Sequence, residues 1–190
     1  KKGETVFQSP SFEEAVLTVE LSDTPVPMYD SDESEAKRIY QCIANTMSKY
    51  MERFGLEKVV VGISGGIDSA VSAALFVDLL GPQNVLLINM PGKYNTDTTK
   101  SLASKLAENL KAKYVIISIE DSVAHTINQI NGLNIDAQNK NNNLALTSFH
   151  LENIQARDRS SRILAAAAAA FGGVFPSNAN KTETTVGYAT

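Results

Sequence analysis

The sequence predicts an α/β fold, with one twisted, mostly parallel sheet and helices on both of its faces. The first observation is that short apolar runs rich in β-branched residues alternate with amphipathic helical patterns from residue 32 onward. The second is that strand–helix–strand units of this kind favour parallel pairing through right-handed crossovers. The third is length, because 190 residues suit one α/β domain with a substantial core.

The expected elements begin with a helix from about Asp32 to Phe54, where apolar residues recur at three- and four-residue spacing and Gly55 provides a stop. Its apolar stripe is expected to pack on the sheet. Cys42, the single cysteine, is expected to be a small core residue, and no disulfide can form within the chain. Strands are then expected at 59–63, 84–90, 114–119 and 173–176, and helices at 67–80, 98–110, 122–131 and 148–171.

Two segments depart from this alternation. Residues 1–30 hold a strand-like stretch, Val16–Leu21, that prolines follow, so this part is expected to be a tail or linker. The domain itself is expected to occupy residues 31–190. The asparagine-rich stretch Asn131–Asn143 is expected to be a solvated loop.

Charge and composition exclude several classes of partner. The formal net charge of −4 and the pI near 5.2 provide no basic field for nucleic acid. The longest apolar run, Ile163–Phe171, is mostly alanine and too short to cross a bilayer, so no membrane association is expected and the cytoplasm fits best. His125 and His150 belong to no cluster that would bind zinc and are expected to be ordinary helix residues.

A glycine-rich turn is the strongest functional signal. The apolar run 59–63 stops at the segment 64–69, Ser-Gly-Gly-Ile-Asp-Ser, and a helical pattern starts at once. Glycines let backbone N–H groups approach an anion closely, the serines add hydroxyl groups, and the helix N-terminus adds its positive end. An aspartate inside an anion site suits a divalent cation that bridges carboxylate and phosphates. The turn therefore predicts binding of ATP with Mg²⁺ through Gly62, Ile63, Ser64, Gly65, Gly66, Ile67, Asp68 and Ser69.

Other glycine motifs do not fit this turn. A Walker loop requires a lysine after its glycines and a dinucleotide fingerprint requires Gly-x-Gly-x-x-Gly, and the turn has neither. An ordinary strand-to-helix turn is the simpler alternative, but five matching positions in the right context favour a phosphate site. Ligands of open α/β sheets bind beyond the carboxyl ends of the strands. Residues that follow later strands, Met90, Ser177 and Asn178, are therefore expected at the same ATP site.

The turn at 64–69 resembles the pyrophosphate loop of the ATP pyrophosphatases, which include NAD synthetase, GMP synthetase, asparagine synthetase and several tRNA-modifying enzymes. Two later segments, 153–159 (Asn-Ile-Gln-Ala-Arg-Asp-Arg) and 180–188 (Asn-Lys-Thr-Glu-Thr-Thr-Val-Gly-Tyr), are similar to segments of NAD synthetase. The chain thus resembles the synthetase domain of glutamine-dependent NAD synthetases. This resemblance implies the adenine nucleotide alpha hydrolase-like, Rossmann-like version of the α/β fold.

The same resemblance implies a carbon–nitrogen ligase that uses ATP to amidate nicotinic acid adenine dinucleotide (deamido-NAD). In that family the nicotinate carboxylate attacks the α-phosphorus of ATP, pyrophosphate leaves, and ammonia converts the acyl adenylate to NAD and AMP. No protein nucleophile is required. The resemblance assigns Asp68 and Glu183 to Mg²⁺, and Asn153, Arg157 and Glu183 to the dinucleotide.

Some features of the chain depart from the family pattern. Without the surrounding motif, Glu183 would be a helix-start acid that complements the helix dipole. Many relatives carry Thr-Gly where this chain has Ser177-Asn178, so Ser177 is expected to supply the hydroxyl contact to ATP. Arg159 and Arg162 match no family role and are expected to be solvated or paired. The chain begins without methionine and ends before the family's glycine-aspartate and lysine segments, so a fragment with a C-terminally incomplete synthetase domain is expected.

The resemblance also implies partners. Residues 1–30 resemble the last strand of the nitrilase-like amidase domain that precedes the synthetase in glutamine-dependent enzymes, so ammonia is expected from glutamine through the same parent chain, or free from solution. Relatives are homodimers, so a homodimer or larger homo-oligomer is expected. Two alternatives stay open. One is another ATP pyrophosphatase such as GMP synthetase, which should lack the segments 153–159 and 180–188, and the other is a truncated nucleotide-binding module without turnover.

Overall fold

The computed structural model describes residues 9, 11–12, 14–16, 18, 20, 34–92 and 97–187, without the side chains of 97–100. The chain forms two compact units, Lys1–Gly55 and Leu56–Thr190. The tail and the strand expected within residues 1–30 lie mostly outside the described residues, so both stay predictions.

The first unit contains one long helix, α1 (Glu35–Arg53). It begins after Ser34, whose side chain accepts a hydrogen bond from a backbone N–H of the first turn at 3.3 Å, and it ends before Gly55. This confirms the helix expected here. Cys42 is exposed, so its prediction as a core residue is wrong. The spacing of apolar residues identified a face of the helix but does not tell whether another segment covers that face, and the neighbouring Ile43 is also 44% exposed.

The second unit is built on a parallel sheet of three strands in the order β1 (Val59–Gly62), β2 (Val85–Asn89) and β3 (Lys113–Ile116). Val61 lies opposite Leu87, and Leu87 lies opposite Tyr114 in the next strand. All three strands were expected, although β3 ends short of the predicted limit at 119. Parallel pairing brings the carboxyl ends of the strands to one edge of the sheet, which is where open α/β sheets bind ligands.

A further segment lies along the other side of β1. Val174 forms a single parallel bridge with Val59, and the Val60 N–H donates to the Val174 carbonyl oxygen at 2.8 Å. The strand expected here is therefore reduced to one bridge. A Cβ on Gly173 would lie 2.3 Å from the backbone oxygen of Lys58, so glycine is required for the two backbones to approach this closely.

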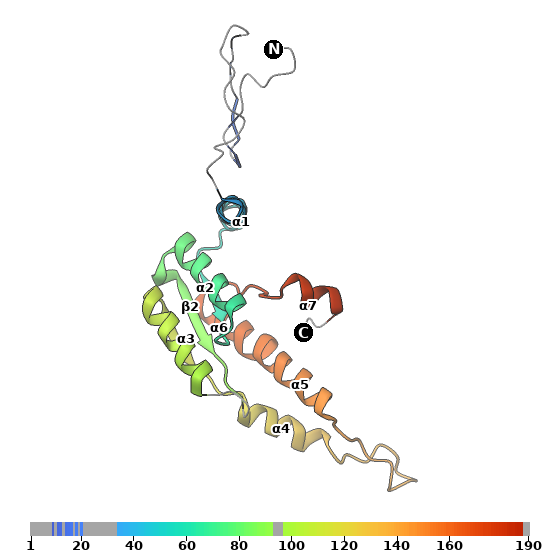
Figure 1. Cartoon of the computed structure of the whole chain (residues 1–190). Coiled ribbons are helices and arrows are strands. Elements are labelled where there is room, and N and C mark those ends of the chain that lie inside the picture. The colour runs from blue at the N-terminus through green and yellow to red at the C-terminus, as the bar shows by residue number, and fades with distance from the viewer. Residues whose placement is uncertain are drawn as a thin grey trace. The chain divides into compact units, whose positions relative to one another are not determined.

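Helices cover both faces of this sheet. The helices of this unit are α2 (Ile67–Leu80), a 3-10 turn at Pro82–Asn84, α3 (Asp97–Leu110), α4 (Glu120–Ile130), α5 (Ser148–Arg157), η2 (Asp158–Leu164), α6 (Ala165–Phe171) and α7 (Lys181–Val186). On one face α2 and α3 contact the strands, with β2 between them in Figure 1. On the other face α4, η2 and α6 enclose a core that includes Val60, Ile88, Ile119, Ile163 and Ala168. The predicted fold class is confirmed.

The helix expected as one piece at 148–171 is divided into three. Between α5 and α6 the helix η2 is a π-helix, whose turns are wider than those of an α-helix. The wide turn accommodates an extra residue while Ile163 and Leu164 still reach the core, so the apolar pattern of the sequence did not reveal the change. Segments of this kind occur frequently at functional sites.

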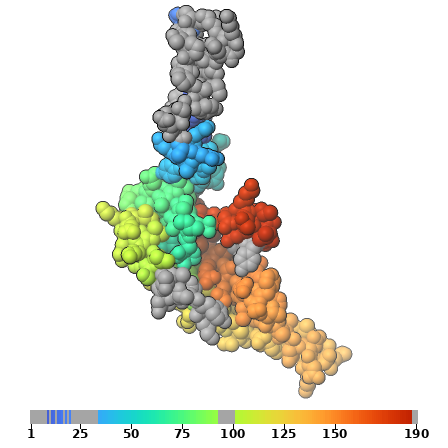
Figure 2. Space-filling view, viewed as in Figure 1, coloured from blue at the N-terminus to red at the C-terminus, as the bar shows by residue number. Residues whose placement is uncertain are grey.

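The loop expected between α4 and α5 is confirmed. Asn134 pairs with Asn143 in an isolated bridge, and the Asn134 Oδ1 accepts from the backbone N–H of Asp136 at 3.0 Å. Most residues of this stretch are exposed, and Figure 2 shows the yellow-to-orange segment at the surface of the second unit. Among the described residues, no helix has the length and apolar character needed to span a membrane.

Candidate functional site

The turn between β1 and α2 is a loop that is tied back on itself. Gly65 has a φ of +88°, a conformation that glycine adopts without the steric cost other residues meet. Ser69 Oγ accepts from the Ser64 N–H at 3.3 Å and donates to the Gly66 carbonyl oxygen at 3.0 Å. Gly66 precedes α2 without a side-chain cap, so no side chain competes with an anion for the first N–H groups of that helix.

A cavity of about 770 Å³ lies beside this loop, at the carboxyl end of the sheet. Its size falls in the range typical of small-molecule sites. The loop, the end of β2, the π-helix η2 and the segment that leads into α7 all contribute to its walls. The structure thus brings together most of the residues predicted to bind ATP and Mg²⁺, namely Gly62, Ile63, Ser64, Gly66, Asp68, Ser69, Met90, Ser177, Asn178 and Glu183.

Gly62 is the point at which these elements meet. A Cβ at this position would lie 2.9 Å from Met90 Cε and 3.2 Å from Leu164 Cδ1, so β2 and η2 both press on the start of the loop. Asn178 Nδ2 donates to the Gly62 carbonyl oxygen at 3.4 Å, while Asn178 Oδ1 is buried and has no hydrogen-bond partner in the described part of the chain. A buried acceptor in a cavity wall suits a donor on a ligand.

Asp68 and Glu183 lie on different elements yet line the same cavity. Glu183 forms a capping box with Asn180: the Asn180 N–H donates to Glu183 Oε2 at 3.0 Å, and the Glu183 N–H donates to Asn180 Oδ1 at 2.9 Å. Glu183 therefore has the helix-start role that was its alternative. Carboxylate oxygens beside a phosphate loop fit Mg²⁺, which takes one or two carboxylates together with phosphate oxygens. No cluster of three or more His, Cys, Asp or Glu suited to a metal occurs among the described residues.

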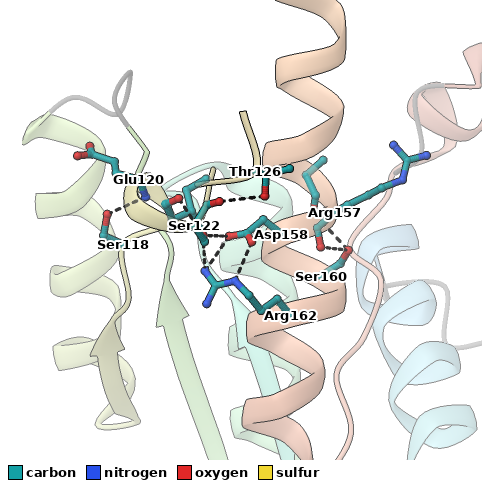
Figure 3. Close-up of polar contacts among 10 residues, drawn as sticks. Ser118, Glu120, Ser122, Thr126, Arg157, Asp158, Ser160 and Arg162 are labelled. Atoms are coloured by element: carbon teal, nitrogen blue, oxygen red, sulfur yellow. Dashed lines mark hydrogen bonds and ion pairs between the residues drawn. The ribbon is translucent and has the colours of Figure 1, made fainter. Parts of the chain in front are cut away.

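Asn153 and Arg157 are adjacent but do not line this cavity. They lie one turn apart on α5, where Arg157 Nη1 donates to Asn153 Oδ1 at 3.1 Å and Asn153 Nδ2 donates to the Phe149 carbonyl oxygen at 3.0 Å. Arg157 is exposed, and Figure 3 shows its side chain extending away from Asp158. Of the three residues assigned to the dinucleotide by resemblance, Asn153 and Arg157 therefore lie outside the walls of the cavity, and Glu183 lines it.

Arg159 lines the cavity, although no role was predicted for it. Its side chain is half-buried, and its Nε donates to the Met90 carbonyl oxygen at 3.2 Å. Burial lowers the pKa of Arg159, and the neighbouring Asp158 carboxylate partly opposes that shift. Asn89, Ser160 and Phe175 also line the cavity without having been predicted. No local signal marked these residues, because their place in the cavity depends on η2, the end of β2 and the segment after α6 meeting in space.

Asp158 connects η2 to the start of α4. Figure 3 shows its carboxylate between Arg162 and Ser122: Arg162 Nε and Nη2 donate to it at 2.7 Å each, and Ser122 Oγ donates to it at 2.7 Å. The hydrogen bond from Arg162 is the main reason why the pKa of Asp158 lies below its ordinary value. The expectation that Arg162 is paired is confirmed.

A parallel sheet that carries a Ser-Gly-Gly-x-Asp-Ser loop after its first strand, with helices on both faces, defines a Rossmann-like protein of the ATP pyrophosphatase class. Within that class, the chain belongs to the NAD synthase family, whose model matches residues 39–190. The family predicted from the three motifs is thereby confirmed.

Individual relatives agree with this assignment. The chain is 34% identical over 172 residues to a glutamine-dependent NAD(+) synthetase of Xanthomonas campestris pv. campestris (strain 8004), an alignment that covers 90% of this chain and 30% of that protein. The solved glutamine-dependent NAD+ synthetase of Acinetobacter baumannii in complex with adenosine diphosphate superposes with a TM-score of 0.76 at 28% identity, over 87% of this chain and 30% of that one. The solved NMN synthetase of Francisella tularensis gives a TM-score of 0.70 at 26% identity, over 83% and 60%. The chain therefore spans about a third of the length of the glutamine-dependent relatives.

Proposed function

We propose that this chain is the ATP-binding part of a glutamine-dependent NAD synthetase, which amidates deamido-NAD to NAD and releases AMP and pyrophosphate. The observation that carries the proposal is the cavity in which the loop at 62–69 and Glu183, from two separate family motifs, lie together. In this reading the loop N–H groups and α2 hold the phosphates that become the leaving group. Asn153 and Arg157 bind the dinucleotide, because an arginine fork suits a carboxylate or a phosphate.

Asp68 and Glu183 would hold Mg²⁺ at this site. When bound, the ion supplies neutralisation of phosphate charge during departure of pyrophosphate. Asp68 belongs to the loop and lies in the first turn of α2, the helix whose first N–H groups would receive the phosphates. Glu183 reaches the same cavity while its Oε2 also accepts the Asn180 N–H.

The wider assembly belongs to the same proposal. Ammonia comes from glutamine through an amidase domain of the parent chain, or free from solution, and the parent protein works in the cytoplasm as a homodimer or larger homo-oligomer. A GMP synthetase is disfavoured because the family match includes the segments 153–159 and 180–187. A nucleotide-binding module without turnover is favoured only for the isolated chain, which spans about a third of its relatives.

The proposal is tested with the parent protein and with the 190-residue chain in parallel. The chain is titrated with ATP and Mg²⁺ by calorimetry. The parent protein is assayed for AMP with ATP, Mg²⁺, ammonium and one of three candidate substrates: deamido-NAD, nicotinic acid mononucleotide or xanthosine monophosphate. We expect ATP binding by the chain, little or no NAD from the chain alone, and NAD with equimolar AMP from the parent protein and deamido-NAD. Release of AMP with the mononucleotide or with xanthosine monophosphate, and not with deamido-NAD, would contradict the proposal and would identify that compound as the substrate.

A further inference from the structure

The cavity beside the phosphate loop holds an unusual distribution of charge. Two carboxylates, Asp68 and Glu183, and one guanidinium, Arg159, are the charged groups among the described residues that line it. A nucleotide adds several negative charges to this space. Binding an anion in a partly desolvated site costs free energy unless cations or N–H donors interact with it. Among the described residues of the cavity wall, Arg159 is therefore the side-chain cation that can compensate the negative charge of a nucleotide.

The carboxylate next to Arg159 in sequence is already engaged elsewhere. Asp158 accepts two hydrogen bonds from Arg162 and one from Ser122, all at 2.7 Å, and its side chain is only 11% exposed. Among the described residues, Arg159 has one hydrogen bond, from Nε to the Met90 carbonyl oxygen, and no ion pair. Burial lowers the pKa of Arg159 because desolvation disfavours the charged guanidinium, and the charge of Asp158 partly opposes this shift. The Nη groups thus keep their donors for a ligand.

The π-helix fixes this guanidinium close to the loop. Leu164, the last residue of η2, presses on Gly62 at the start of the loop, and Arg159 lies five residues earlier on the same helix. The Met90 carbonyl that anchors Arg159 Nε belongs to the residue whose side chain also contacts the Gly62 position. A guanidinium held through Nε in a cavity wall keeps the planar fork of Nη donors that suits phosphate oxygens.

We propose that Arg159 is a catalytic residue that binds the phosphate chain of ATP through its Nη donors. This inference rests on the proposed function. As the nicotinate carboxylate oxygen bonds to the α-phosphorus, the bond from that phosphorus to the bridging oxygen breaks and its electron pair leaves on pyrophosphate. Negative charge moves onto the phosphate oxygens during this step, and a fixed guanidinium beside them stabilises the transition state more than the ground state.

The test compares Arg159→Gln and Arg159→Lys with Arg162→Gln, a matched control in which the changed arginine lies on the same helix but is not part of the cavity wall. Each 190-residue variant is checked by thermal melting, titrated with ATP and Mg²⁺ by calorimetry, and titrated with adenosine by ligand-observed NMR. We expect Arg159→Gln to weaken ATP binding by about ten- to a hundred-fold and adenosine binding by less than about two-fold, because hydrogen bonds to charged groups contribute on this scale. Arg159→Lys should lie between, since it keeps the charge and loses the fork.

The control variant should lower the melting temperature and keep the wild-type ratio of ATP to adenosine affinity. Equal loss of ATP and adenosine binding in the Arg159 variants would overturn the inference, because it would mean that Arg159 only holds Met90 in place. Unchanged ATP binding by Arg159→Gln would overturn it as well. Should Arg159→Gln not fold, Arg159→Lys gives the same comparison. Absence of ATP binding by the unsubstituted chain would overturn the proposed function together with this inference, so the two failures are distinguishable.

Discussion

Replacing Gly173 with alanine perturbs the bridge that joins Val174 to β1. The new Cβ would lie 2.3 Å from the carbonyl oxygen of Lys58 and 2.7 Å from its carbonyl carbon. Both are backbone atoms, which cannot turn aside as the end of a side chain can. Overpacking commonly costs about 1–3 kcal/mol, and we take its upper value here because the clash is with backbone. The two bridge hydrogen bonds, from Val60 and Val174, add about 1 kcal/mol each, so the free energy of unfolding should fall by roughly 3–5 kcal/mol.

The same change should weaken ATP binding, because the segment that follows the bridge supplies Ser177, Asn178 and Glu183 to the cavity. Gly172→Ala is the matched control. Gly172 has a φ of +74° and nothing within 4 Å of the position of a Cβ, so alanine there should cost only the strain of a left-handed conformation, about 1–2 kcal/mol. It should leave the cavity and its affinity for ATP unchanged.

Urea unfolding followed by circular dichroism measures the first effect, and calorimetric titration with ATP and Mg²⁺ under folding conditions measures the second. The reasoning is refuted if Gly173→Ala is no less stable than Gly172→Ala. It is also refuted if both variants bind ATP with wild-type affinity, since the bridge would then have no part in placing the cavity wall.

Three further outcomes are expected. Asp68→Asn in the parent protein should keep the fold, checked by thermal melting, and lose most Mg²⁺-dependent formation of NAD, about 10²-fold or more, because an amide is a poor ligand for a hard cation; near-normal turnover at saturating Mg²⁺ would remove Asp68 from the metal site. Arg157→Lys should raise KM for deamido-NAD far more than KM for ATP, because lysine loses the two-donor fork; an unchanged KM and rate for deamido-NAD would mean that Arg157 is structural. The pKa of Asp158 in the folded protein lies below its unfolded value near 3.9. The ionised carboxylate therefore stabilises the folded state above the unfolded pKa, and this stabilisation is lost as the pH falls through the folded pKa. Asp158→Asn should therefore destabilise at pH 7 and much less at pH 3 in urea unfolding, and a loss independent of pH would contradict the pairing with Arg162.

Local sequence patterns were sufficient for most of the fold. The β-branched run before the loop predicted β1, and the glycine at 65 predicted a turn that the structure shows with a positive φ. Alternation of strands and helices predicted a parallel sheet, and hence a site at the carboxyl ends of its strands. These inferences succeeded because each depends on a few consecutive residues whose chemistry allows few alternatives.

The failures involve contacts between residues far apart in the chain. Cys42 was placed in the core because its helix is amphipathic, but periodicity does not tell whether another layer covers that face. Arg159 was taken as solvated or paired, yet it lines the cavity because the turn of η2 meets the end of β2. The binding roles of Asn153 and Arg157 stay predictions, since neither residue lines that cavity.

The π-helix sets the rotational phase between the two helices that it joins. One residue on an α-helix corresponds to about 100° of rotation, so a single deletion within η2, for example of the exposed Ser161, would turn α5 by about that angle relative to α6. Such a deletion would restore regular α-helical hydrogen bonding. It would turn Arg157 and Arg159 together relative to α6, because both residues precede position 161. The less regular helix η2 thus determines which side chains of this region face the cavity, Arg159 and Ser160 among them.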